Sequence, residues 1–122
     1  MARILIIDDN PEICAILRET LESAGYEIMV AGDGRAGLAL HRARRADLVI
    51  TDIFMPEQDG IETILELQRD DPDVKIIAMS GGGLAGNLSY LPAARALGAV
   101  HSISKPFDCE EVLATVRTVL DS

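Results

Sequence analysis

The chain alternates short apolar runs with longer segments in which apolar residues recur every three or four positions. Five runs of five or six residues are typical of strands buried on both faces of a sheet: residues 3–7, 26–31, 47–51, 74–79 and 100–104. The segments between and after them have helical spacing, and the first is expected to begin at Pro11 and to end before Gly25.

Capping residues mark where most of the helices should begin. Asn10, Asp33, Asp59 and Asp108 each precede an amphipathic segment and can accept hydrogen bonds from its first free amides. A further helix is expected only over about 88–97, after the glycine-rich stretch 81–89, which we interpret as a loop. Each of the four capped helices has a predicted buried face. In chain order these faces are Ile13, Ile16, Leu17, Leu21 and Ala24 in the helix after Asn10; Ala36, Ala39, Leu40 and Ala43 in the helix after Asp33; Ile61, Ile64, Leu65 and Gln68 in the helix after Asp59; and Val112, Val116, Val119 and Leu120 in the helix after Asp108.

Five strands alternating with five helices predict an α/β fold with a doubly wound parallel sheet, because parallel neighbours need crossover connections. At 122 residues the chain is one domain long, so we expect a single domain over residues 1–122 with no output domain. Arg35, His41, Arg42, Arg44 and Arg45 are interpreted as the solvated side of the second helix.

Composition excludes several classes of protein. The chain has 11 Lys and Arg against 20 Asp and Glu, a formal net charge of −9, so it should not bind nucleic acid directly. The start of the chain has no apolar signal segment, and no apolar run is long enough to span a membrane; we therefore expect a cytoplasmic protein. Cys14 and Cys109 are interpreted as ordinary thiols.

Polar residues follow four of the five strands at the edge where such sheets bind ligands. Asp8 and Asp9 follow the first strand, Asp52 the third, Ser80 the fourth and Lys105 the fifth. Three carboxylates in one crevice repel one another unless a cation joins them, and oxygen ligands of this kind suit Mg²⁺. A carboxylate beside Mg²⁺ can attack a phosphoryl group, and Asp52 is the best candidate because its strand is central.

These motifs resemble those of the receiver domain of two-component response regulators over the whole chain. The matching segments are the acidic pair Asp8-Asp9, the segment DIFMPEQDG that begins at Asp52, the hydroxyl of Ser80 and the Lys105-Pro106 turn. The resemblance implies strand order 2-1-3-4-5, phosphorylation of Asp52 by a histidine kinase or a histidine phosphotransfer protein, and an unknown output protein as partner. It also implies that Asp9, Asp52 and the carbonyl of Phe54 bind Mg²⁺, with Asp8 acting largely through water.

The sequence departs from the family pattern at three places. Ser102 stands where the family usually has an aromatic residue that moves on activation, and the stretch between Ser80 and Gly98 is long and rich in glycine. Phe54 places a phenyl ring two residues after the phosphoacceptor, where we expect it to hinder water. We therefore expect rearrangement of residues 81–91 to carry the signal in place of an aromatic side chain.

Other functions remain open from sequence alone. The same fold can serve as an interaction module that is never phosphorylated. A phosphatase of the haloacid dehalogenase type also uses an aspartyl nucleophile and Mg²⁺, but its DxD motif differs from Asp8-Asp9-Asn10. Flavin mononucleotide in the same crevice would bring its phosphate against the acidic pair. The receiver function is therefore favoured, as a switch rather than an enzyme.

Overall fold

The computed structural model describes residues 2–52, 60–80, 101–104 and 108–121. Along the chain these residues form β1 (Arg3–Ile7), α1 (Pro11–Ser23), β2 (Glu27–Ala31), α2 (Gly34–Ala43), β3 (Leu48–Asp52), α3 (Gly60–Asp70), β4 (Lys75–Ser80), β5 (His101–Ser104) and α6 (Cys109–Leu120). The predicted strands lie within one residue of these bounds, and α1 begins at Pro11 and ends before Gly25, as predicted. The helix predicted over 88–97 and the loop before it lie outside the described residues.

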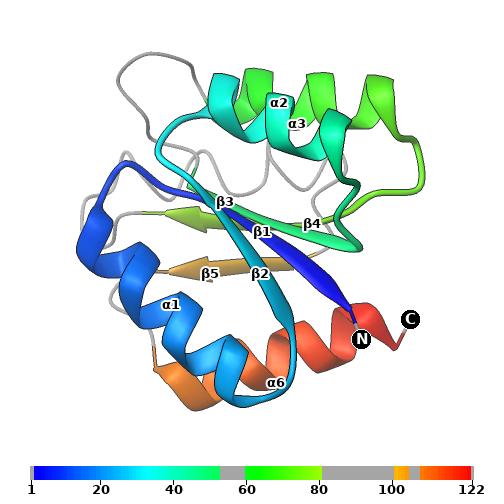
Figure 1. Cartoon of the computed structure of the whole chain (residues 1–122). Coiled ribbons are helices and arrows are strands. Elements are labelled where there is room, and N and C mark those ends of the chain that lie inside the picture. Colours follow the sequence, from blue (N-terminus) through cyan, green and yellow to red (C-terminus); the bar gives the residue numbers. More distant parts are fainter. Residues whose placement is uncertain (1, 53–59, 81–100, 105–107, 122) are drawn as a thin grey trace.

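The strands form one parallel sheet in the order β2-β1-β3-β4-β5, with α2 and α3 over one face and α1 and α6 over the other (Figure 1). The predicted α/β architecture with a parallel sheet is therefore confirmed. Successive side chains of β1 point to opposite faces of the sheet. Leu5 and Ile7 pack in the core beneath α2 and α3, whereas Ile4 and Ile6 pack in the core beneath α1 and α6. Because both faces are covered, the whole of β1 after Arg3 is buried.

Three of the predicted helix caps are confirmed. The Asn10 side chain accepts hydrogen bonds from the amides of Glu12 and Ile13 at the start of α1. Asp33 caps α2 through the amide of Ala36, and Asp108 caps α6 through the amide of Glu110. The predicted cap Asp59 lies outside the described residues.

Some predicted buried faces are rotated in the structure. On α1 and α3 the prediction is confirmed for Leu17, Leu21 and Ile64, which are buried. It is wrong for Ala24, Ile16 and Leu65: Ala24 is exposed, and Ile16 and Leu65 are 45% and 41% exposed. Cys14 and Leu67, which were not predicted to be buried, pack in the core. Ala36, Ala39 and Ala43 of α2 are also exposed, because the helix turns Gly37, Leu38 and His41 toward the sheet. The positions of the alanines in the sequence of α2 therefore did not predict which side of this helix faces the core. On α6 the prediction is confirmed for Val112, Val116 and Val119, whereas Leu120 is only partly buried.

The prediction that His41 lies on a solvated face is wrong. Its imidazole is 2% exposed, Nδ1 accepts the amide proton of Ala46 at 3.1 Å, and Nε2 lies 3.2 Å from a carboxylate oxygen of Asp71. A histidine with a hydrogen-bond partner for each ring nitrogen can be buried at little cost. The neighbouring Arg42, Arg44 and Arg45 are exposed, as expected.

Candidate functional site

Three carboxylates converge where β1 and β3 end. Asp8 and Asp9 directly follow β1, and Asp52 is the last residue of β3, the strand paired with β1. One carboxylate oxygen from each of the three lies within 4.8 Å of the other two. The structure therefore brings the three acids together at one edge of the sheet, as the sequence predicts.

The three acids differ in burial and in backbone support. Asp8 and Asp52 are 1% and 4% exposed, whereas Asp9 is open to solvent. The Asp8 carboxylate accepts the amide proton of Asn10 at 2.9 Å, and its own amide donates to the carbonyl of Ala31 on β2. The turn after β1 is thus tied to both the helix that follows and the edge strand. These contacts hold Asp8 in place beside Asp52.

The thiol of Cys14 also supports this turn, a contribution that the sequence reasoning missed. Cys14 lies in the first turn and a half of α1, is 7% exposed, and directs Sγ at 3.3 Å to the carbonyl of Asp8. Its spacing of four residues from the cap Asn10 is the signal that could have placed it against the strand end. Cys14 and Cys109 are both free thiols.

The remaining predicted site residues are placed only in part. Ser80 is the last residue of β4, one position beyond Met79, which pairs with Asp52 across the sheet. The backbone therefore ends β4 at the same edge as the three acids. The side chain of Ser80 is not among those described, and Lys105 and Phe54 lie outside the described residues. β5 ends at Ser104, directly before Lys105 in the sequence.

The donor set fits a hard divalent cation. The carboxylate oxygens of two buried aspartates and one exposed aspartate lie close together, and Mg²⁺ prefers oxygen ligands of this kind. Among the residues that the structure describes, this is the one group of three or more acidic, His or Cys side chains close enough to hold a metal ion. Asp8, Asp9 and Asp52 could therefore hold such an ion together.

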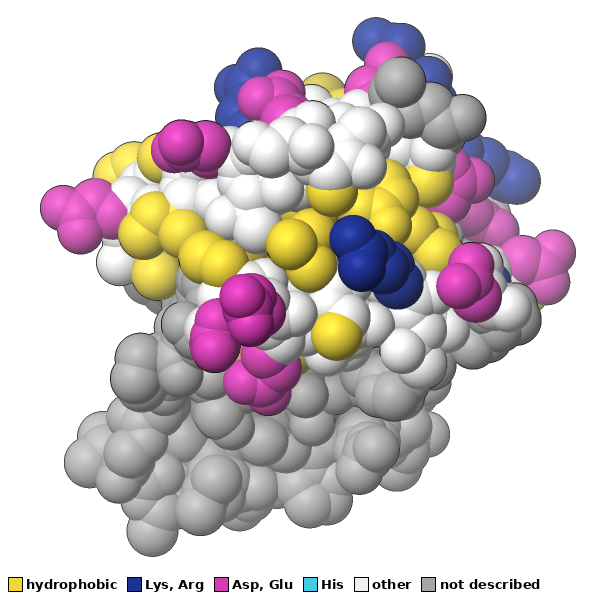
Figure 2. Space-filling view, turned by 90° about the horizontal axis from the view of Figure 1, so that it is seen from below, with side chains coloured by type: hydrophobic (Ala, Val, Ile, Leu, Met, Phe, Trp, Pro, Cys, Tyr) yellow, Lys and Arg dark blue, Asp and Glu magenta, His cyan; other side chains and the backbone are white. Residues whose placement is uncertain are grey.

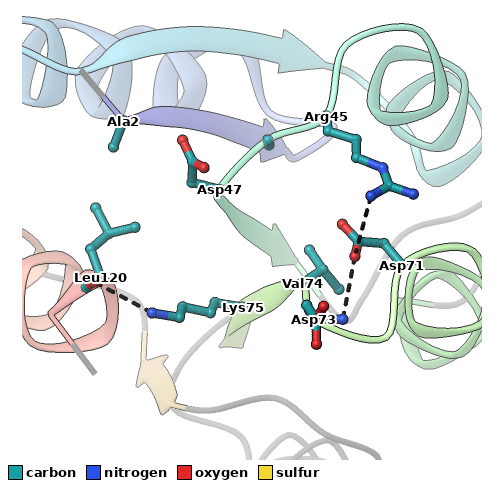
Figure 3. A pocket seen from close by; sticks show the side chains of 9 residues that line it. Ala2, Arg45, Asp47, Asp71, Asp73, Val74, Lys75 and Leu120 are labelled. Carbon is teal, nitrogen blue, oxygen red and sulfur yellow. Dashed lines mark hydrogen bonds and ion pairs between the residues drawn. The ribbon is translucent and has the colours of Figure 1, made fainter.

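A cavity of about 470 Å³ adjoins the acids on the side of the edge strand. The cavity is lined by Asp8 and Asp9, by residues of α1, by Val30 of β2 and by Gly32, which directly follows β2. A larger cavity, of about 550 Å³, lies at the opposite end of the sheet, between Asp47, Asp73 and Lys75 (Figure 3). It is remote from the carboxylates, because Lys75 begins β4 and Ser80 ends it.

A family model, that of the response regulator receiver domain, matches residues 4–117. Among curated proteins, the chain is 37% identical over 98% of its length to the DNA-binding dual master transcriptional regulator RpaA of a Synechocystis species, of which it covers 49%. It is 32% identical to sporulation initiation phosphotransferase F of Bacillus subtilis, covering 97% of this chain and 93% of that one. The chain spans about half the length of most of the curated relatives it matches.

Solved structures of response regulators are also similar to this chain. The chemotaxis protein CheY4 of Vibrio cholerae superposes with a TM-score of 0.87 at 30% identity, covering 98% of each chain. The receiver domain of NtrX from Brucella abortus superposes with a TM-score of 0.91 at 27% identity, again over 98% of each chain. Within the described residues, no helix is long and apolar enough to cross a membrane.

Proposed function

Because the chain belongs to the receiver domain family of two-component response regulators, we propose that it is a phosphorylation switch in which Asp52 accepts the phosphoryl group. The observation that carries this proposal is the convergence of Asp8, Asp9 and Asp52 at the carboxyl ends of two paired central strands. Asp52 is the acid best suited to be the nucleophile, since it stands on β3 between β1 and β4.

In the proposed reaction, a carboxylate oxygen of Asp52 attacks the phosphorus of the donor. A new P–O bond forms to Asp52 while the bond from phosphorus to the donor breaks, and the departing group keeps that electron pair. The step needs mainly positioning and neutralisation of charge on the phosphoryl oxygens. Mg²⁺, when bound, would supply much of that positive charge.

The proposed ligands of Mg²⁺ are Asp9, Asp52 and the backbone carbonyl of Phe54, with Asp8 contacting the ion through water. Asp8 is supported by the amide of Asn10 and by the turn that Cys14 braces, so it can orient such a water without moving. Lys105 and the hydroxyl of Ser80 are proposed to contact the phosphoryl oxygens. Their places at the ends of the last two strands of the sheet support these roles.

The proposed donor is a histidine kinase or a histidine phosphotransfer protein, and the proposed output is contact with another protein. This assignment is supported by the family and by the name of the Bacillus subtilis relative, which is itself a phosphotransferase. We place the reaction in the cytoplasm, which the two free thiols support. A single domain over residues 1–122 that folds with five helices remains part of this proposal.

The experiment is incubation with acetyl phosphate, with and without Mg²⁺, followed by measurement of intact mass. We expect one added phosphoryl group on the wild type in Mg²⁺ and none after chelation. Asp52→Asn should remain unmodified, whereas the control Asp73→Asn, at the other end of the sheet, should react like the wild type. Equal modification of the wild type and Asp52→Asn would contradict the proposed acceptor.

A further inference from the structure

The cavity beside the acids has the make-up of a ligand site. Its walls are largely apolar: Pro11, Cys14 and Ala15 of α1 face Val30 near the end of β2. Its volume of about 470 Å³ falls within the range of small-molecule pockets. An apolar recess of this size that ends in two carboxylates differs from a plain metal site, because an inorganic ion makes no use of apolar walls.

Charge at the two ends of the cavity selects the ligand. Asp8 and Asp9 form one end, and the third carboxylate of Asp52 lies within 4.8 Å of them, so this end attracts a cation. Arg18 forms the rim farther along α1, where its guanidinium is 57% exposed and pairs with Glu22 at 3.2 Å. A second positive charge on the ligand would be repelled by the guanidinium of Arg18. The charges therefore fit a molecule with one cationic head and a neutral apolar body.

We propose that this cavity binds a small organic monocation, a primary ammonium carried on a short apolar or aromatic body. The ammonium would donate hydrogen bonds to the carboxylates of Asp8 and Asp9, and the body would lie between Ala15 and Val30. α1 belongs to the face drawn in Figure 2, where apolar side chains form a band with acidic and basic side chains beside it.

This binding would compete with Mg²⁺, since both cations need Asp8 and Asp9. The competition rests on the proposed function, whereas the binding of the ammonium in the absence of metal does not. An organic monocation would thereby hold the domain in a state unable to be phosphorylated. The site thus links phosphorylation to the supply of a small amine.

Gly32 provides a variant that closes the cavity without removing any charge. A Cβ added to Gly32 would meet no atom within 4 Å, and its backbone is not in the left-handed region, so a larger residue fits the fold. Gly32→Val should therefore narrow the cavity while the three acids stay intact. Ala15→Met, on the exposed wall of α1, is a second variant of the same kind.

The test is titration of the metal-free chain of 122 residues with benzylammonium, followed through its amide NMR signals. We expect saturable shifts confined to residues 8–18 and 30–32. Benzyl alcohol, the neutral analogue, should bind about tenfold more weakly, because it lacks the charge-assisted hydrogen bonds. Asp9→Asn should weaken binding about fivefold, since this carboxylate is exposed. The matched control Asp73→Asn should bind like the wild type.

Gly32→Val and Ala15→Met should each lose most of the affinity for benzylammonium while retaining the response of residues 8 and 9 to Mg²⁺. Added Mg²⁺ should displace benzylammonium from the wild type. Equal affinity for benzyl alcohol or unchanged binding by both filled variants would each overturn the inference. Lack of competition would also overturn it if Mg²⁺ shifts the signals of residues 8 and 9. If benzylammonium binds but Mg²⁺ does not shift the signals of residues 8 and 9, the proposed metal site fails while the ammonium site stands.

Discussion

The buried imidazole of His41 joins three segments of the chain at the end of the sheet opposite the acids. Because Nδ1 accepts the amide proton of Ala46, the hydrogen on the ring must be at Nε2, which donates it to Asp71. Asp71 in turn accepts the amide proton of Asp73 through its other oxygen. The end of α2, the entry to β3 and the end of α3 are therefore held by one side chain.

Removal of this side chain should be costly. In His41→Ala, the buried Ala46 amide loses its partner and the Asp71 carboxylate loses one of its hydrogen bonds, so we expect the free energy of unfolding to fall by about 2–4 kcal/mol. Arg42→Ala is the matched control: it breaks the bond to Asp70 between the same two helices, but Arg42 is 57% exposed, and the loss should stay below about 1 kcal/mol. Chemical denaturation of both variants measures the difference. Equal losses would show that burial of His41 contributes nothing.

Repulsion among the three acids should be measurable without any phosphodonor. Three carboxylates whose oxygens lie within 4.8 Å destabilise the metal-free fold, so Asp52→Asn should raise its free energy of unfolding by about 1 kcal/mol. Mg²⁺ should stabilise the wild type and have a much smaller effect on this variant. Thermal unfolding with Mg²⁺ and with chelator provides both comparisons. If Mg²⁺ does not change the melting temperature of the wild type, the three acids do not share a metal site.

At the scale of elements, α2 approaches the sheet closely because it presents a glycine to β1. A Cβ at Gly37 would collide with the side chain of Ile7, which is fully buried. Ile7 is the residue directly before Asp8, so the contact between α2 and β1 also supports the turn that carries the acidic pair. Helix packing and site geometry are thus coupled at this point.

Gly37→Ala therefore sets two effects against each other. Replacement of glycine by alanine within a helix gains up to about 1 kcal/mol in propensity, whereas overpacking of a full core costs about 1–3 kcal/mol. We expect net destabilisation of about 1 kcal/mol and shifted amide signals at Asp8 and Asp9. Gly32→Ala, with open space around its Cβ, is the control and should unfold like the wild type. A Gly37→Ala variant more stable than the wild type would contradict the close contact.

Glu27, the first residue of β2, forms ion pairs with arginines of β1 and of the segment after α2. Its carboxylate bonds to the guanidinium of Arg3 on β1 and lies 3.5 Å from that of Arg44 after α2. The hydrogen bond from Arg3 and then the charges of Arg3 and Arg44 lower the pKa of Glu27 below its ordinary value of 4.5. Arg3 also donates to the carbonyl of Arg45, so the group joins β1, β2 and the connection from α2 to β3.

This lowered pKa makes a small part of the stability dependent on pH. The unfolded chain takes up the proton near pH 4.5, above the pKa of the folded state, so the contribution of Glu27 is present at neutral pH and is lost as the pH falls through its folded pKa. The free energy of unfolding of Glu27→Gln should accordingly decline less between pH 6 and pH 3 than that of the wild type. Parallel declines would show that the ion pair does not contribute.

At the scale of the whole molecule, the pattern of apolar runs was enough to predict the parallel sheet and the edge at which the acids gather. A strand buried on both faces leaves an unambiguous signal, and the acids that follow β1 and β3 stand out against it. Helix orientation was less predictable: Ile16 and Leu65 are apolar yet exposed, and His41 is polar yet buried. Those outcomes depend on partners distant in sequence, such as Asp71 for His41, which no local pattern reveals.

The proposed phosphorylation of Asp52 is tested most directly by chemical identification of the modified residue. The chain is treated with acetyl phosphate and Mg²⁺, the acyl phosphate is reduced with borohydride, and the peptides are sequenced by mass spectrometry. Reduction converts a phosphorylated aspartate to homoserine, so we predict homoserine at position 52 and unmodified aspartate at positions 8 and 9. Homoserine at position 8 or 9, or its absence from all three, would contradict the assignment of Asp52 as the phosphoacceptor.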